Sequence, residues 1–82
     1  MNIRYNGNNQ VYINGAKKIL LCSYTTIIAY WDRQKDIIVK TDKFYSVTSS
    51  KHFNQFIKFY GFEGKTIKII EDDKFQKIID KI

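Results

Sequence analysis

Residues 24–41, Tyr-Thr-Thr-Ile-Ile-Ala-Tyr-Trp-Asp-Arg-Gln-Lys-Asp-Ile-Ile-Val-Lys-Thr, decide the expected fold of this 82-residue chain. The segment from Tyr24 to Trp31 is dense in β-branched and aromatic side chains, the composition that strands prefer. A charged turn over residues 32–36 follows, and Ile37 to Thr41 returns as another strand. Because consecutive short strands usually pair with each other, this stretch predicts antiparallel pairing.

The sequence before Tyr24 predicts two further strands joined by a tight turn. Val11-Tyr12-Ile13 precedes the pair Asn14-Gly15, and residues 19–23 form the returning strand. An Asn-Gly pair between two β segments is a strong hairpin signal, since both residues tolerate a positive φ. The Asn-rich residues 1–9 are read as a turn or a short edge strand.

After Thr41 the hydrophobic period changes from that of a strand to that of a helix. Asp42-Lys43 predicts a turn, and residues 44–47 are compatible with an extension of the sheet. Residues 51–60 predict an amphipathic helix after the N-cap candidates of Thr48-Ser49-Ser50, with Gly61 as its C-terminal stop. Its apolar side chains recur at i, i+3, i+4 and i+7, namely Phe53, Phe56, Ile57 and Tyr60.

The last part of the chain predicts one more strand and a second helix. Residues 65–70 alternate between apolar and polar side chains, as a strand does. Glu71-Asp72-Asp73 then supplies the acidic start that favours a helix. The helical spacing returns in its apolar side chains, Phe75, Ile78, Ile79 and Ile82.

These segments together predict one small α+β domain over residues 1–82. It is an antiparallel β meander packed with two helices, in the order β-β-β-β-α-β-α. The length excludes a second domain, and the longest apolar run is far shorter than the ~20 residues of a membrane span. A single cysteine, Cys22, and an N-terminus without the apolar segment of a signal peptide favour a cytoplasmic location.

The charge balance is strongly basic. Fourteen Lys and Arg residues stand against 8 Asp and Glu, which gives a net charge of +6. Such a domain attracts nucleic acid or an acidic protein surface, although lysines also simply keep a small Ile-rich protein soluble. The lysines expected to form a basic patch are Lys17, Lys18, Lys65 and Lys68.

The densest polar stretch is residues 45–52, at the junction between strand and helix. Helix N-terminal amides attract anions, and the flanking hydroxyls with Lys51 and His52 suit a phosphate. Helix capping by Thr48 or Ser49, with His52 at the edge of the core, is the alternative explanation of the same residues. The candidate partner-binding residues are Tyr45, Ser46, Thr48, Lys51, His52, Asn54 and Lys58.

The sequence holds no recognisable catalytic or metal motif, so we expect no enzyme activity, no cofactor and no metal. One Cys and one His do not make a zinc site by themselves. Cys22 and His52 are formally a nucleophile and a base, but a cysteine inside a predicted strand is usually a small buried hydrophobe. Four aromatic residues would make a stacking platform for single-stranded nucleic acid, unless they fill the core: Tyr12, Tyr24, Tyr30 and Trp31.

Two stretches carry a family resemblance. The first is Ser23-Tyr24-Thr25-Thr26-Ile27-Ile28-Ala29-Tyr30, followed after the charged turn by Ile37-Ile38-Val39. The second is Tyr45-Ser46-x-Thr48-Ser49-x-x-His52-x-x-x-Phe56, closed by Tyr60-Gly61-Phe62. In this order and spacing they resemble a domain of unknown function found in phages and conjugative elements of Gram-positive bacteria. The resemblance spans residues 20–62, and Ser49 stands where the family pattern has Thr.

The resemblance implies a mobile-element source and a bacterial host cell. Small proteins of such elements often act by binding. We therefore expect a non-enzymatic inhibitor of a host defence or nucleic-acid-handling protein complex, of the anti-CRISPR type, that works by steric occlusion. Two alternatives remain. One is a basic nucleic-acid-binding module that contacts RNA or DNA directly, and the other is a small structural or oligomeric phage component.

Overall fold

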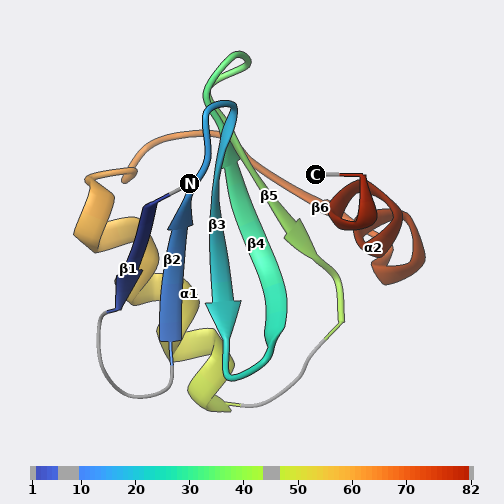
Figure 1. Cartoon of the computed structure of the whole chain (residues 1–82), viewed down its shortest axis with the longest axis horizontal. Coiled ribbons are helices and arrows are strands. Elements are labelled where there is room, and N and C mark those ends of the chain that lie inside the picture. The colour runs from blue at the N-terminus through green and yellow to red at the C-terminus, as the bar shows by residue number, and fades with distance from the viewer. Residues whose placement is uncertain (1, 6–9, 44–46, 82) are drawn as a thin grey trace.

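The computed structural model, which describes residues 2–5, 10–43 and 47–81, shows a sheet of six strands with one helix packed on each face (Figure 1). Within those residues no helix is long and apolar enough to cross a membrane. The elements are β1 (Asn2–Tyr5), β2 (Gln10–Asn14), β3 (Lys18–Ser23), β4 (Thr26–Asp32), β5 (Ile37–Thr41), α1 (Val47–Tyr60), β6 (Ile67–Ile70) and α2 (Asp72–Asp80).

The predicted α+β class and the order β-β-β-β-α-β-α are confirmed from β2 onward, and β1 adds a strand at the edge. The strands lie in chain order, and every neighbouring pair is antiparallel except β5 and β6, which are parallel. The meander therefore ends at β5. Because α1 crosses over the sheet between β5 and β6, β6 enters from the same end as β5 and must run parallel to it.

Two turns differ from the sequence prediction. The segment from Tyr24 to Trp31 is not one strand, because Tyr24 and Thr25 form the turn between β3 and β4, with Tyr24 at a φ of 57°. The turn after Asn14 does form, but without the expected positive φ at Asn14 or Gly15; what distinguishes Gly15 is the small space left for a side chain. A Cβ on Gly15 would lie 3.0 Å from the Lys18 carbonyl oxygen, whose hydrogen bond from the Gly15 N–H closes the turn at 2.8 Å.

The start of α1 is also corrected. The helix begins at Val47, so Thr48, Ser49 and Ser50 lie inside its first turn and do not precede it as caps. The extension of the sheet expected at residues 44–47 falls on this helix start at Val47, and residues 44–46 lie outside the described part of the chain. Four side chains of α1 at helical spacing face the sheet and are buried: Ser49, His52, Phe53 and Phe56.

The larger of two cores lies between α1 and the sheet. Phe56 is fully buried at its centre, with its ring 5.3 Å from that of Tyr12 and 5.7 Å from that of Phe62, both in edge-on geometry. This arrangement is favourable for aromatic pairs beyond the area they bury. The buried members of this core are Tyr12, Ile19, Leu21, Ile28, Ala29, Ile38, Phe53, Phe56 and Phe62.

A bulge in β4 lets two successive residues join this core. Leu21 pairs with Ala29 and Cys22 with Ile27, so Ile28 is an extra residue without a partner in β3. An extra residue of this kind breaks the strict alternation of side chains in a strand. Ile28 and Ala29 therefore both pack on the α1 side, while Ile27 packs on the opposite side.

The smaller core lies between α2 and the other face of the sheet. Phe75 is the one buried residue of α2, and its ring stacks on that of Tyr30 at 5.9 Å. Leu20 and Val39 complete the buried set, and half-buried isoleucines surround it. Phe75 is thus the main attachment of α2 to the sheet, and Ile78 and Ile79 of the same helix pack beside it.

We predict that Phe75→Ala lowers the free energy of unfolding by about 3–5 kcal/mol, because it removes a fully buried ring and leaves a cavity. The matched control is Phe59→Ala on α1, whose half-exposed ring borders those of Tyr12 and Tyr60 at the edge of the other core, so that a smaller loss of about 1 kcal/mol is expected. Urea unfolding followed by circular dichroism measures both. Equal losses for the two variants would show that α2 is not anchored as described.

Candidate functional site

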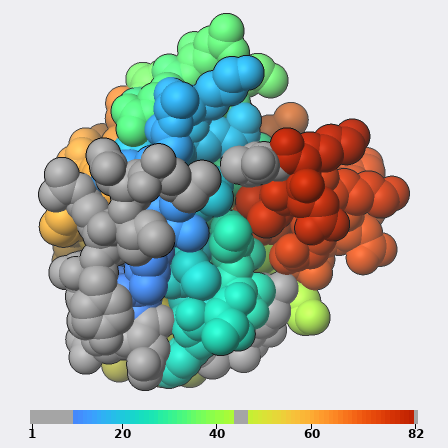
Figure 2. Space-filling model, viewed as in Figure 1, coloured from blue at the N-terminus to red at the C-terminus, as the bar shows by residue number. Residues whose placement is uncertain are grey.

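Basic side chains from four separate segments gather at one end of the sheet. The turns after β2 and β4 and the start of β6 all lie at this end, and the turns project from the body of the molecule (Figures 1 and 2). The Arg33 backbone N–H donates to the Lys17 carbonyl oxygen at 3.0 Å, and Arg33 Nε donates to the Gly15 carbonyl oxygen at 3.1 Å. We call this surface the basic end; its residues are Lys17, Lys18, Arg33, Lys35, Lys65 and Lys81.

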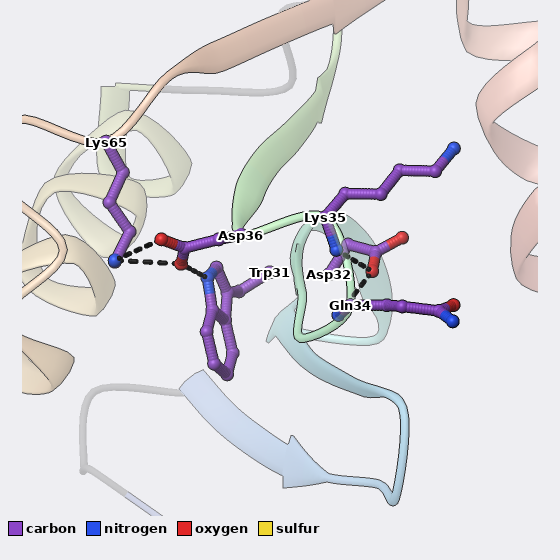
Figure 3. A network of polar contacts seen from close by, with 6 residues as sticks. All are labelled: Trp31, Asp32, Gln34, Lys35, Asp36 and Lys65. Carbon is purple, nitrogen blue, oxygen red and sulfur yellow. Dashed lines mark hydrogen bonds and ion pairs between the residues drawn. The ribbon is translucent and has the colours of Figure 1, made fainter.

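Asp36 ties the basic end together (Figure 3). Trp31 Nε1 donates a hydrogen bond to Asp36 Oδ1 at 2.9 Å, and Lys65 Nζ lies 2.8 Å from Oδ1 and 3.0 Å from Oδ2. The hydrogen bond from Lys65, with that from Trp31, lowers the pKa of Asp36 from its ordinary 3.8. Asp36 has a φ of 55°, a backbone conformation that Asp adopts more readily than most residues. We call these contacts of Asp36 with Trp31 and Lys65 the clamp around Asp36. They join the β4–β5 turn to the segment before β6.

Asp32 orders the same turn from the other side. Its Oδ1 accepts hydrogen bonds from the backbone N–H groups of Gln34 at 2.9 Å and Lys35 at 3.1 Å. Its Oδ2 lies 3.9 Å from Lys18 Nζ. The carboxylates of Asp32 and Asp36 are thus both held by neighbouring donors, while the Lys17 and Lys35 side chains are exposed to solvent. The end keeps its positive character.

A groove of about 430 Å³ opens beside the lysines, between the β2–β3 turn and the end of α2. Its volume lies within the range of small-molecule pockets. The floor is apolar and the rim is basic, with the lining residues Ile13, Gly15, Ala16, Lys17, Lys18, Leu20 and Lys81. An apolar floor beside positive charge suits a partner that offers both aliphatic and acidic groups.

Three of the four lysines of the predicted basic patch, Lys17, Lys18 and Lys65, belong to the basic end, and Lys68 does not. Lys17 and Lys18 line the groove, Lys65 is held by Asp36, and Lys68 on β6 lines a smaller hollow together with Lys35. Four of the predicted partner-binding residues lie instead on the exposed side of α1, away from the sheet; we call Thr48, Lys51, Asn54 and Lys58 the α1 stripe. Tyr45 and Ser46 lie outside the described residues.

His52, predicted among the partner-binding groups, is buried with 1 % of its surface exposed. It faces the sheet because it shares the helical spacing of Ser49, Phe53 and Phe56. Its Nδ1 lies 2.7 Å from Ser23 Oγ, which lies 2.9 Å from Ser49 Oγ. The ring Nε2 is buried without a hydrogen-bond partner among the described residues. His52 therefore joins α1 to the end of β3 and is not available to a partner.

The Cys22–His52 pair does not form. Cys22 Sγ contacts the Tyr24 carbonyl oxygen at 3.5 Å, and burial raises the pKa of the thiol. Since Ser23 contacts His52 on the α1 side, the preceding Cys22 side chain points to the other face of the strand. Across the parts of the chain that the structure describes, no three His, Cys, Asp or Glu residues are grouped to hold a metal ion.

The aromatic stacking platform is also absent where the sequence suggested it. Tyr12 and Tyr30 are buried in the two different cores, on opposite faces of the sheet. Trp31 stacks on Phe62 at 4.9 Å, and the Arg33 guanidinium covers its ring at 5.3 Å. Tyr24 is exposed, but it stands in a turn. The rings fill the interior because a chain of this size has few other side chains with which to do so.

Sequence reasoning missed two side-chain networks. The Ser23–Ser49–His52 cluster joins residues far apart in the chain, and the one local signal was the i, i+3 spacing of Ser49 and His52. The clamp around Asp36 depends on β6 lying next to β5, which no local pattern predicted.

The fold and the basic end define a small α+β domain with a groove beside a cluster of lysines. The chain belongs to a family of unknown function, DUF8033, which matches residues 1–75. No curated protein and no solved structure matches it. The resemblance to a domain of unknown function is thus confirmed at the level of the family, over a longer span than the motifs covered. The family match carries no sign of a phage or mobile-element source.

We predict that Ser23→Ala lowers the free energy of unfolding by about 1–3 kcal/mol, because His52 Nδ1 and Ser49 Oγ lose a buried partner. Thr25→Ala, which removes a hydroxyl at an exposed position two residues away, should change stability by less than about 0.5 kcal/mol. Chemical denaturation of the three proteins measures the difference. A Ser23→Ala protein as stable as the Thr25→Ala control would contradict the structural role of the cluster.

We predict that Asp36→Asn removes an acid transition at the basic end. A carboxylate whose pKa is lowered on folding stabilises the fold above its unfolded pKa of about 4, and that contribution is lost as pH falls through the lower folded value. The fluorescence of Trp31, the one tryptophan, should therefore titrate with a midpoint below 3.8 in the parent. In Asp36→Asn this transition should vanish, and the melting temperatures of the two proteins should converge at low pH. A transition that persists in Asp36→Asn belongs to another group.

Proposed function

We propose that this domain is a non-enzymatic binding protein that covers an acidic surface of a nucleic-acid-handling protein complex and inhibits that complex by steric occlusion. The observation that carries the proposal is the basic end, where six Lys and Arg side chains from four segments converge. A cluster of one charge sign attracts an oppositely charged partner over long range and orients it during encounter. The net charge of +6 adds to that attraction.

The groove favours a protein partner over bare nucleic acid. Ile13, Ala16 and Leu20 are apolar residues of its lining, and protein interfaces combine an apolar centre with a polar or charged rim. A phosphate backbone offers no aliphatic group to fill such a floor. The burial of Tyr12 and Tyr30 also removes rings on which bases would stack. The chemistry of the site therefore fits an acidic protein segment with aliphatic side chains.

More specifically, we propose that the protein is encoded by a phage or conjugative element. It would act in the bacterial cytoplasm on a host defence complex, as anti-CRISPR proteins do. The supports of this proposal are the small size, the positive charge and the resemblance of residues 20–62 to proteins of such elements. The alternative is a basic nucleic-acid-binding module, which would use the same lysines for phosphate contacts alone.

We predict that Lys17→Glu/Lys35→Glu abolishes capture of the partner from a bacterial lysate, because it reverses two exposed charges of the basic end. Lys51→Glu/Lys58→Glu is the matched control on the α1 stripe, with the same change in net charge. Affinity capture with tagged protein, in parallel with and without nuclease, measures both. We expect a protein complex that survives nuclease, is lost in the first variant and is kept in the second.

Other outcomes have separate meanings. If the control variant loses the partner and the first variant keeps it, the α1 stripe is the binding surface and the basic end is not. If the captured material is nucleic acid that nuclease removes, the alternative replaces the proposal. In that case binding to a short DNA duplex should weaken steeply as salt rises, because each phosphate contact releases counterions.

A further inference from the structure

We propose that β6 is a dimerisation strand, which pairs antiparallel with β6 of a second copy of this chain and joins the two sheets into one. β6 is the last strand of the sheet, so in the described part of the chain only β5 is paired with it. Its residues Ile67 and Ile69 are exposed, at 47 % and 60 %. An edge strand with exposed aliphatic side chains is a ready template for another strand. The inference does not depend on the proposed function.

The hydrogen bonds between β5 and β6 show which backbone groups of β6 face away from β5. The Ile38 N–H donates to the Thr66 carbonyl oxygen at 2.9 Å, and the Asp42 N–H donates to the Ile70 carbonyl oxygen at 2.8 Å. The backbone groups of Thr66 and Ile70 therefore face β5. Because successive residues of a strand alternate in direction, the N–H and C=O groups of Ile67 and Ile69 face away from β5.

One antiparallel register uses both outward residues. With the two-fold axis at Lys68, Ile67 lies opposite Ile69 of the second copy, and Ile69 opposite Ile67 of the second copy. Each pair then exchanges two N–H···O bonds, as hydrogen-bonded antiparallel pairs do, which gives four in all. A shift by one residue would set an outward group against an inward one and lose these bonds.

The side chains agree with that register. The register of β5 and β6 places Ile67 beside Ile38, which belongs to the α1 core, so the four isoleucines of the dimer would form one aliphatic row on the α1 side. At the strand ends, Lys65 would stand opposite Glu71 of the second copy, with opposite charges. The two Lys68 side chains would face each other on the axis, and like charges in that position weaken a strand pair.

The first test is sedimentation velocity from low micromolar to near-millimolar concentration. The parent should pass from monomer to dimer, Ile69→Lys should remain a monomer, and Lys68→Thr should dimerise at a lower concentration than the parent. Val47→Lys is the matched control, since it places the same charge on an aliphatic position of α1 that is 66 % exposed. It should dimerise as the parent does. Circular dichroism confirms that each variant is folded.

The second test reads the register itself. In a Cys22→Ser background, Lys68→Cys should form a disulfide dimer on mild oxidation, because residues on the axis of a non-hydrogen-bonded pair have Cα atoms about 4.5 Å apart, within disulfide range. Ile69→Cys in the same background should cross-link far less, since its copies are diagonal neighbours about 7–8 Å apart.

Three results would overturn the inference. They are a parent that is monomeric at every concentration, a dimer that Ile69→Lys leaves intact or Val47→Lys disrupts equally, and cross-linking as efficient at position 69 as at position 68.

Discussion

Two fully buried phenylalanines, Phe56 and Phe75, hold a helix on either face of one sheet. A chain of 82 residues buries only about 60–65 % of its unfolded surface, so few side chains are left to make each core. Strands β3, β4 and β5 must therefore be apolar on both faces. The crossover of α1 makes β6 parallel to β5, and the alternating strand directions of the meander bring the β2–β3 and β4–β5 turns to one end of the sheet.

The sequence allowed the elements to be predicted wherever one local pattern dominates. The spacing of Phe53, Phe56 and Ile57 predicted α1, and the alternation of residues 65–70 predicted β6. The boundaries were less accurate where tertiary contacts decide them. Tyr24 has the composition of a strand residue, but its positive φ closes the turn between β3 and β4. The β4 bulge is a matter of register between two strands, so Ile28 alone carries no signal of it.

The candidate site was predictable in only part of its residues and not in its arrangement. Arg33, Lys35 and Lys81 of the basic end were not expected in the basic patch, and Lys68, which was expected there, is not part of the basic end. Lys17, Lys18 and Lys65 were expected as a basic patch, and the topology does bring them to one end of the sheet. The role of His52 could not be read from its neighbours, because its partner Ser23 is 29 residues away. Helical spacing, however, places His52 on the same side of α1 as Phe53 and Phe56. For deciding whether His52 is buried, this spacing is a better guide than the polar residues around it in the sequence.

The parallel pairing of β5 and β6 has a consequence for synthesis in the cell. In the series β2 to β5, each strand pairs with the next strand in the sequence. Each pair can therefore form as soon as both of its strands have left the ribosome. β6 and α2 are synthesised only after the whole of α1. Until then the edge of β5 is open, and Leu20, Tyr30 and Val39 lack the ring of Phe75. The nascent chain thus passes through a stage with an unpaired edge and an uncovered aliphatic face, when it is most in need of protection from neighbouring chains.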